Sequence, residues 1–167
     1  ALASAAYWSA GAIGWTSWNF RVFYLFGAIL NVPFLAVGTL YLLGDQLPGG
    51  RDLGRRVHGA LIPIATFCAG VVAVTPLRAP LPADGMPEGK AVFGVLPRVM
   101  AAVGSGLGAT VLIAGAAWSA WRLIVRKGPG RLALTNVLIA AGSIVLSLGG
   151  TFFTGEEVEV GFGIFLV

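Results

Sequence analysis

The chain contains a run of twenty-two consecutive residues without a charged side chain, from Val22 to Leu43. At the rise of an α-helix this run is about 33 Å long, and the hydrocarbon layer of a membrane is about 30 Å thick. A surface helix of a soluble protein needs a polar face, and a buried core helix is usually shorter. The run therefore predicts a helix that crosses a membrane.

The composition supports the same interpretation. Of the 167 residues, 57% are hydrophobic and 11% are charged, whereas globular proteins carry about 25% charged residues. The net charge of +4 does not indicate nucleic-acid binding, because the basic residues lie in short connections and never form a Lys/Arg-rich segment. With one cysteine, Cys68, the chain cannot form an intrachain disulfide.

We predict an all-α fold, a polytopic transmembrane helix bundle that forms one domain over residues 1–167. Five complete spans and a truncated sixth are expected, at about 1–18, 21–43, 57–77, 98–121, 132–153 and 158–167. The last apolar run covers only about 12 Å as a helix, which is too short to cross. We therefore expect the chain to be a trimmed part of a longer one.

The basic residues also predict an orientation. If the connections after the second and fourth spans share one side, that side carries seven of the eleven Lys and Arg residues. Basic residues near span ends favour the cytoplasm. We therefore expect loops 44–56 and 122–131 to be cytoplasmic. Four basic residues in the second loop either reflect this topology alone or contact anionic lipid: Arg122, Arg126, Lys127 and Arg131.

Small residues recur at helical spacing within the predicted spans. Helices in a bilayer associate through close packing of small residues, so each stripe predicts a packing face. The stripes contain Gly59 and Gly70; Gly104, Gly108 and Gly115; and Ser143 and Ser147. Each stripe either packs on another span of the same bundle or faces another protein, and the Gly104 stripe is the main candidate for the second role.

Polar residues inside the spans are few. No acid, lysine or arginine lies near the middle of a predicted span, which argues against a proton relay or an ion-coupled transporter. Asn31 lies near the centre of the second span, and Pro33 leaves one helical carbonyl without its usual partner. Asn31, Pro33 and Thr66 either line a path for a solute, or Asn31 forms an interhelical hydrogen bond.

The residues available for catalysis or metal binding are also few. His58 is the only histidine, so the chain alone cannot hold a haem through two histidines, and His58 with Cys68 is not a zinc ligand set. The sequence contains no G-x-S-x-G motif and no Gly-rich phosphate loop followed by Lys-Ser or Lys-Thr. We expect no enzyme activity, no cofactor and no metal site.

Two strings carry a resemblance. FRVFYLFGAILNVPFLAVGTLYLL at 20–43 and FGVLPRVMAAVGSGLG at 93–108 resemble uncharacterised integral membrane proteins of actinobacteria. The likeness covers most of the chain and implies the plasma membrane of a high-GC Gram-positive bacterium. It brings no activity, cofactor or site residue.

Two hypotheses for the function follow. The first is a non-catalytic accessory or scaffold subunit of a larger membrane complex of respiratory or lipid-transport type. Its partners would be membrane lipids and other integral membrane subunits, and not nucleic acid. The alternative is a small transporter or channel for an uncharged or lipidic solute, which would use Asn31, Pro33, Pro63 and Thr66.

Overall fold

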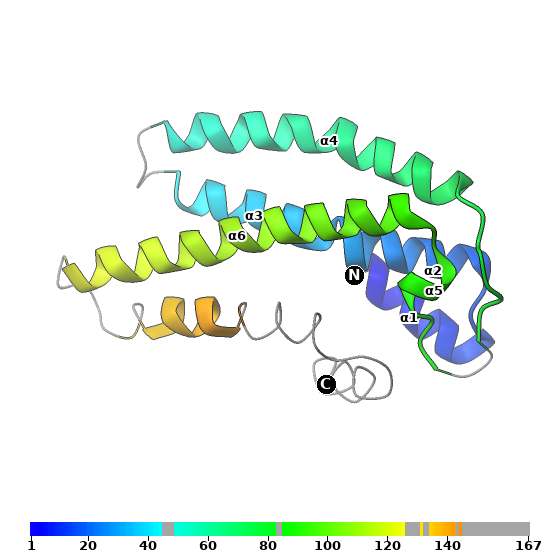
Figure 1. Cartoon of the computed structure of the whole chain (residues 1–167). Helices are drawn as coiled ribbons and strands as arrows, with labels where there is room; N and C mark the ends of the chain where they lie inside the picture. The colour runs from blue at the N-terminus through cyan, green and yellow to red at the C-terminus, as the bar shows by residue number, and fades with distance from the viewer. Residues whose placement is uncertain (45–48, 83–84, 126–130, 132–133, 143, 145–167) are drawn as a thin grey trace.

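The computed structural model describes residues 1–44, 49–82, 85–125, 131, 134–142 and 144. These residues form helices and connections and no strand. The helices are α1 (Leu2–Ile13), α2 (Ser17–Phe23), the π-helix η1 (Tyr24–Ile29), α3 (Asn31–Leu42), α4 (Gly50–Val74), α5 (Gly89–Val92) and α6 (Val95–Val125). Residues 134–142 are also helical. As Figure 1 shows, α3 lies between the long helices α4 and α6.

Three helical segments are long and apolar enough to cross a membrane: Ser17–Leu42, Gly50–Val74 and Val95–Val125. They confirm the predicted all-α membrane class. The predicted number of five complete spans is not confirmed. Helix α1 has 12 residues and is about 18 Å long, so it does not reach across a hydrocarbon layer of about 30 Å. Most of the predicted fifth span and all of the sixth lie outside the described residues.

Local turn chemistry explains why the first predicted span is short. Gly14 adopts φ 81°, a left-handed conformation that favours glycine and ends α1. Two residues later, the Thr16 hydroxyl accepts a hydrogen bond from the Asn19 N–H, and the Asn19 side chain accepts one from the Thr16 N–H. This reciprocal capping box starts α2. The chain therefore turns back on itself and α1 packs on α2.

The second span is not a continuous α-helix. The Leu30 N–H donates to the Leu25 carbonyl at 2.9 Å, which is the i→i−5 bond of a π-helix. The α-helical pattern resumes where the Phe34 N–H donates to the Leu30 carbonyl at 3.1 Å. Pro33 has no N–H, so it cannot donate to the Ile29 carbonyl. The break separates η1, which contacts α1, α4 and α6, from α3, which packs on α4 and α6.

Helix α6 packs on α3 at the glycine positions of its predicted stripe. A Cβ on Gly104 would lie 3.0 Å from the Ile29 carbonyl oxygen, and one on Gly115 would press on the Thr39 side chain. Beside the Gly104 contact, the Ser105 hydroxyl donates to the Ala28 carbonyl at 2.8 Å. This stripe therefore contacts a helix of the same bundle.

The stripe on α4 behaves differently. A Cβ on Gly59 or Gly70 would meet no atom within 4 Å. Helix α4 instead buries its opposite face, through Leu61, Cys68 and Val72. Gly59 and Gly70 therefore contact no other helix among the described residues, because larger apolar side chains make the contact with α3, and packing of this stripe on another protein stays a prediction. Ser143 and Ser147 lie outside the described residues.

One end of the bundle is filled by an aromatic cap, defined here as Phe20, Tyr24, Val92 and Phe93. The Phe93 ring lies 5.3 Å from the Phe20 ring and 4.8 Å from the Tyr24 ring, between centroids. The Arg21 guanidinium donates to the Val72 carbonyl and lies 6.0 Å from the centre of the Phe93 ring. Arg21 thus connects the end of α4 to the cap, which leaves Phe93 fully buried.

Candidate functional site: an apolar cleft between three helices

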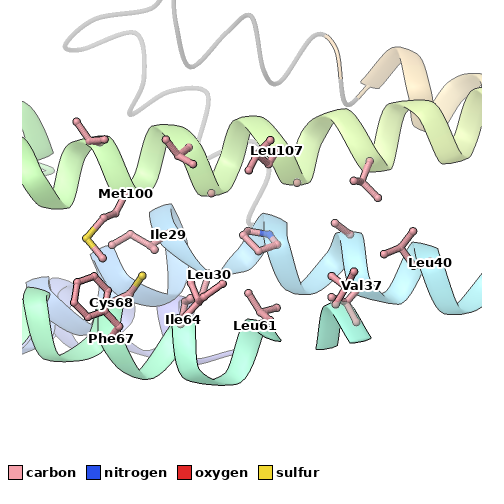
Figure 2. A pocket seen from close by; sticks show the side chains of 18 residues that line it. Ile29, Leu30, Val37, Leu40, Leu61, Ile64, Phe67, Cys68, Met100 and Leu107 are labelled. Carbon is pink, nitrogen blue, oxygen red and sulfur yellow. The ribbon is translucent and has the colours of Figure 1, made fainter. Parts of the chain in front are cut away.

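A cleft of about 460 Å³ lies between α3, α4 and α6 (Figure 2). Eighteen residues line it, and all of them are apolar. The η1–α3 segment contributes Ile29, Leu30, Pro33, Ala36, Val37 and Leu40; α4 contributes Val57, Leu61, Ile64, Phe67 and Cys68; α6 contributes Val99, Met100, Val103, Gly104, Leu107, Gly108 and Val111.

The lining residues recur along each helix at steps of three and four, the spacing of a single helix face. The cleft therefore runs parallel to the helix axes. Along α4 it extends from Val57 to Cys68, which is about 17 Å at the rise of an α-helix. Since these helices are the candidate membrane spans, the long axis of the cleft follows the direction in which they cross.

Exposure shows where the cleft opens. Leu107 on α6 is 67% exposed and Phe67 on α4 is 63% exposed, although both line the cleft. The lining residues Leu30, Ala36 and Val37, on the α3 side, are buried. Helix α3 therefore forms the floor, and the mouth opens sideways between α4 and α6, where a membrane would supply acyl chains.

The two ends of the cleft differ. Figure 2 shows Met100 and Cys68 at one end and Leu40 at the other. Cys68 belongs to the same buried cluster as the aromatic cap, and Met100 packs against that cluster. The cap therefore closes this end. At the opposite end the cleft reaches Val57, and the preceding residue Arg56 is exposed.

The polar residues predicted for a solute path do not meet in this cleft. Pro33 lines it, but Asn31 and Thr66 do not. Asn31 is exposed at the first position of α3, and the Thr66 hydroxyl donates to the Ile62 carbonyl of its own helix at 3.0 Å. A polar path built from Asn31, Pro33 and Thr66 is therefore not assembled within the described residues.

The described basic residues gather at the two ends of the bundle. Helix α4 begins and α6 ends at the same end (Figure 1), which places Arg51, Arg55, Arg56 and Arg122 together at that end. Arg131 is exposed, while Arg126 and Lys127 lie outside the described residues. Near the same end, the Tyr41 hydroxyl lies 3.4 Å from Nδ1 of His58. Within the described ranges, no three His, Cys, Asp or Glu side chains gather as metal ligands.

Comparison of the chain with protein-family models, curated proteins and solved structures finds no match. The cleft must therefore be interpreted from its own geometry. Sequence reasoning missed most of its lining residues, because apolar positions at steps of three and four also occur on faces that contact lipid or another helix. The sequence features that could have pointed to the cleft were Pro33 and the α6 glycines Gly104 and Gly108, all of which line it.

Proposed function

We propose that the protein is a non-catalytic integral membrane protein that binds a lipid-like apolar molecule between α3, α4 and α6. The observation that carries this proposal is the sideways opening of a wholly apolar cleft between candidate membrane spans. Its volume of about 460 Å³ falls within the range of small-molecule sites, roughly 300–1,000 Å³. The proposal corresponds to the lipidic form of the transporter hypothesis.

The lining argues against a polar solute. Among the described residues that line the cleft, no side chain offers a hydroxyl, amide or charge to an occupant. A polar group that enters such an environment loses its bonds to water without replacement, which costs about 2–7 kcal/mol. An acyl chain has no such groups and leaves one apolar medium for another, so its binding depends on dispersion contacts that fill the cleft.

The mouth also favours a flexible chain over a helix from another protein. Helices associate in a bilayer where small residues allow their backbones to approach. The exposed rim instead carries branched and aromatic side chains, Ile64, Phe67, Val103 and Leu107. An acyl chain can follow the uneven surface between these side chains, whereas a rigid helix would remain outside the cleft.

The test is lipid retention by the purified full chain, measured by native mass spectrometry in a mild detergent. Ile64 and Ile62 lie on the same helix at 54% and 56% exposure, but only Ile64 lines the cleft. We expect Ile64→Trp to remove the bound lipid and Ile62→Trp to retain it. Equal retention by both variants would refute binding in this cleft.

A second observation favours the accessory-subunit hypothesis. On α4, Gly59 and Gly70 face open space, which is the surface that a close-packing helix of another subunit requires. Tagged protein purified from its native membrane should then carry a stoichiometric partner, and a Gly59→Leu and Gly70→Leu double variant should lose it. Purification without any partner would count against this role and would leave the lipid proposal standing.

In both proposals the Arg56 end of the bundle faces the cytoplasm, because basic residues are in excess at that end and such residues favour the cytoplasmic side.

A further inference from the structure

We infer that the occupant of the cleft is one anionic phospholipid from the leaflet at the Arg56 end, with an acyl chain between α4 and α6 and its phosphate at Arg56. This inference rests on the proposed lipid binding and adds the charge of the lipid, its leaflet and its direction. Three features of the cleft carry it: its length, its closed end and the charge beside its open end.

The length fits one leaflet. Between Val57 and Cys68 the cleft extends along α4 for about 17 Å, while half of a hydrocarbon layer measures about 15 Å. Val57 follows the polar first turns of α4, which place this end at the edge of the hydrocarbon. The cleft therefore reaches from one membrane surface to about the midplane, the depth that one acyl chain occupies.

The closed end sets the direction of the chain. Beyond Cys68 and Met100, the buried cluster continues through Val72, Val92 and Phe93, each at most 1% exposed. A polar headgroup at that end would have to displace these side chains and the Arg21 contact to Val72. The terminal methyl group of the chain therefore lies beside Met100 and Cys68, and the headgroup lies at the opposite end.

The charge at the open end selects an anionic headgroup. Arg56 immediately precedes the lining residue Val57 and forms no ion pair with a described carboxylate. The neighbouring Arg55 lies one position further from Val57, and its Nη1 atom is 3.9 Å from Oδ1 of Asp52. A guanidinium binds phosphate oxygens through two parallel N–H donors. Arg56 is therefore the headgroup contact.

Binding of two lipids with matched acyl chains tests the inference: phosphatidylglycerol, which is anionic, and phosphatidylcholine, which has no net charge. Native mass spectrometry of the purified full chain gives the affinity for each lipid. We expect phosphatidylglycerol to bind more tightly than phosphatidylcholine. Arg56→Gln should weaken phosphatidylglycerol binding about fivefold, because one basic residue near a membrane surface contributes about 1 kcal/mol. It should weaken phosphatidylcholine binding less, because the choline ammonium group of that lipid offsets the charge of its phosphate.

Matched variants separate failure of the inference from failure of the proposed function. Arg78→Gln removes an exposed arginine at the opposite end of the bundle, where the Arg78 backbone N–H donates to the Val92 carbonyl, and should change neither affinity. If Arg56→Gln preserves the preference for phosphatidylglycerol, or if the parent chain shows no such preference, the headgroup assignment is wrong. Loss of both lipids in Ile64→Trp would in that case still support lipid binding in the cleft. If Ile64→Trp binds both lipids like the parent chain, the inference and the proposed function both fail. A second protein chain that displaces the lipid from the cleft would also overturn the inference.

Discussion

A Cβ atom on Gly108 would lie 2.8 Å from the backbone carbonyl carbon of Val32. The two helix backbones are therefore in direct contact at this point, next to Pro33. Real Cβ atoms do not approach another backbone this closely, and the neighbour here is a main-chain atom that cannot rotate away. Any side chain at Gly108 requires α6 and α3 to separate.

Gly108→Ala should lower the stability of the bundle by about 1–3 kcal/mol, the usual cost of overpacking. Gly106→Ala is the matched control, because it lies on the same helix and its Cβ would meet no atom within 4 Å. The control should be neutral or gain up to about 1 kcal/mol from helix propensity. Thermal unfolding in one detergent measures both. Equal effects of the two variants would contradict the direct contact of α6 with α3.

Ser105→Ala should destabilise the protein by about 0.5–1.5 kcal/mol, because it removes the hydroxyl that donates to the Ala28 carbonyl of the π-helix. Hydrogen exchange of the amides in residues 24–33 should also become faster. Thr110→Val is the control, since that hydroxyl donates within α6, to the Gly106 carbonyl at 2.8 Å. If Ser105→Ala leaves exchange in 24–33 at the parent rate, the bond does not stabilise the helical break.

Arg21→Gln should loosen the aromatic cap and cost about 1.5–3 kcal/mol, the range for a hydrogen bond from a charged donor. The variant loses the contact to the Val72 carbonyl and the position above the Phe93 ring. Arg55→Gln serves as the comparison, because the Arg55–Asp52 pair is exposed and such pairs contribute about 0–1 kcal/mol. Unfolding temperatures that fall equally in both variants would show that Arg21 does not hold the cap.

A phospholipid with a photoreactive diazirine at the end of one acyl chain should crosslink to the closed end of the cleft. Peptide mapping by mass spectrometry should find the adduct near Cys68 and Met100. A lipid with the diazirine close to the headgroup should instead react near Val57, at the open end. The reverse pattern would mean that the chain enters the cleft in the opposite direction.

The sequence predicted the membrane class and the long helices because charge-free runs of twenty or more residues are rare outside membrane-spanning helices. The segments predicted at 21–43, 57–77 and 98–121 coincide with three candidate membrane helices, Ser17–Leu42, Gly50–Val74 and Val95–Val125. Helix α4 begins seven residues before its predicted start. Its first two turns are polar, and hydropathy marks the apolar part of a helix and not its first turn.

The first predicted span failed for a related reason. Residues 1–18 carry no charge, but hydropathy does not register the left-handed conformation at Gly14 or the cap at Thr16. Two local features of the backbone therefore end α1 inside a run that carries no charged residue.

The cleft was beyond sequence reasoning because it depends on how three helices diverge. Ile64 and Ile62 are the same residue type on the same helix, yet one lines the cleft and the other faces away. Apolar residues at helical spacing do not reveal which face a neighbouring helix covers. Asn31 and Thr66 are polar, which makes them candidates for a solute path in the sequence, but their positions on α3 and α4 place them outside the cleft.

The π-helix has a consequence for changes in chain length. Each residue of an α-helix turns the next side chain by about 100°. Because the wide turn holds one residue more than an α-helical turn, removal of one residue between Tyr24 and Ile29 would convert it into a regular turn and leave Phe20 and Val37 on nearly the same faces. Removal of one residue on either side of this turn would instead rotate the aromatic cap against the cleft floor by about 100°, so the π-helical segment should accept a single deletion more readily than the helices that flank it.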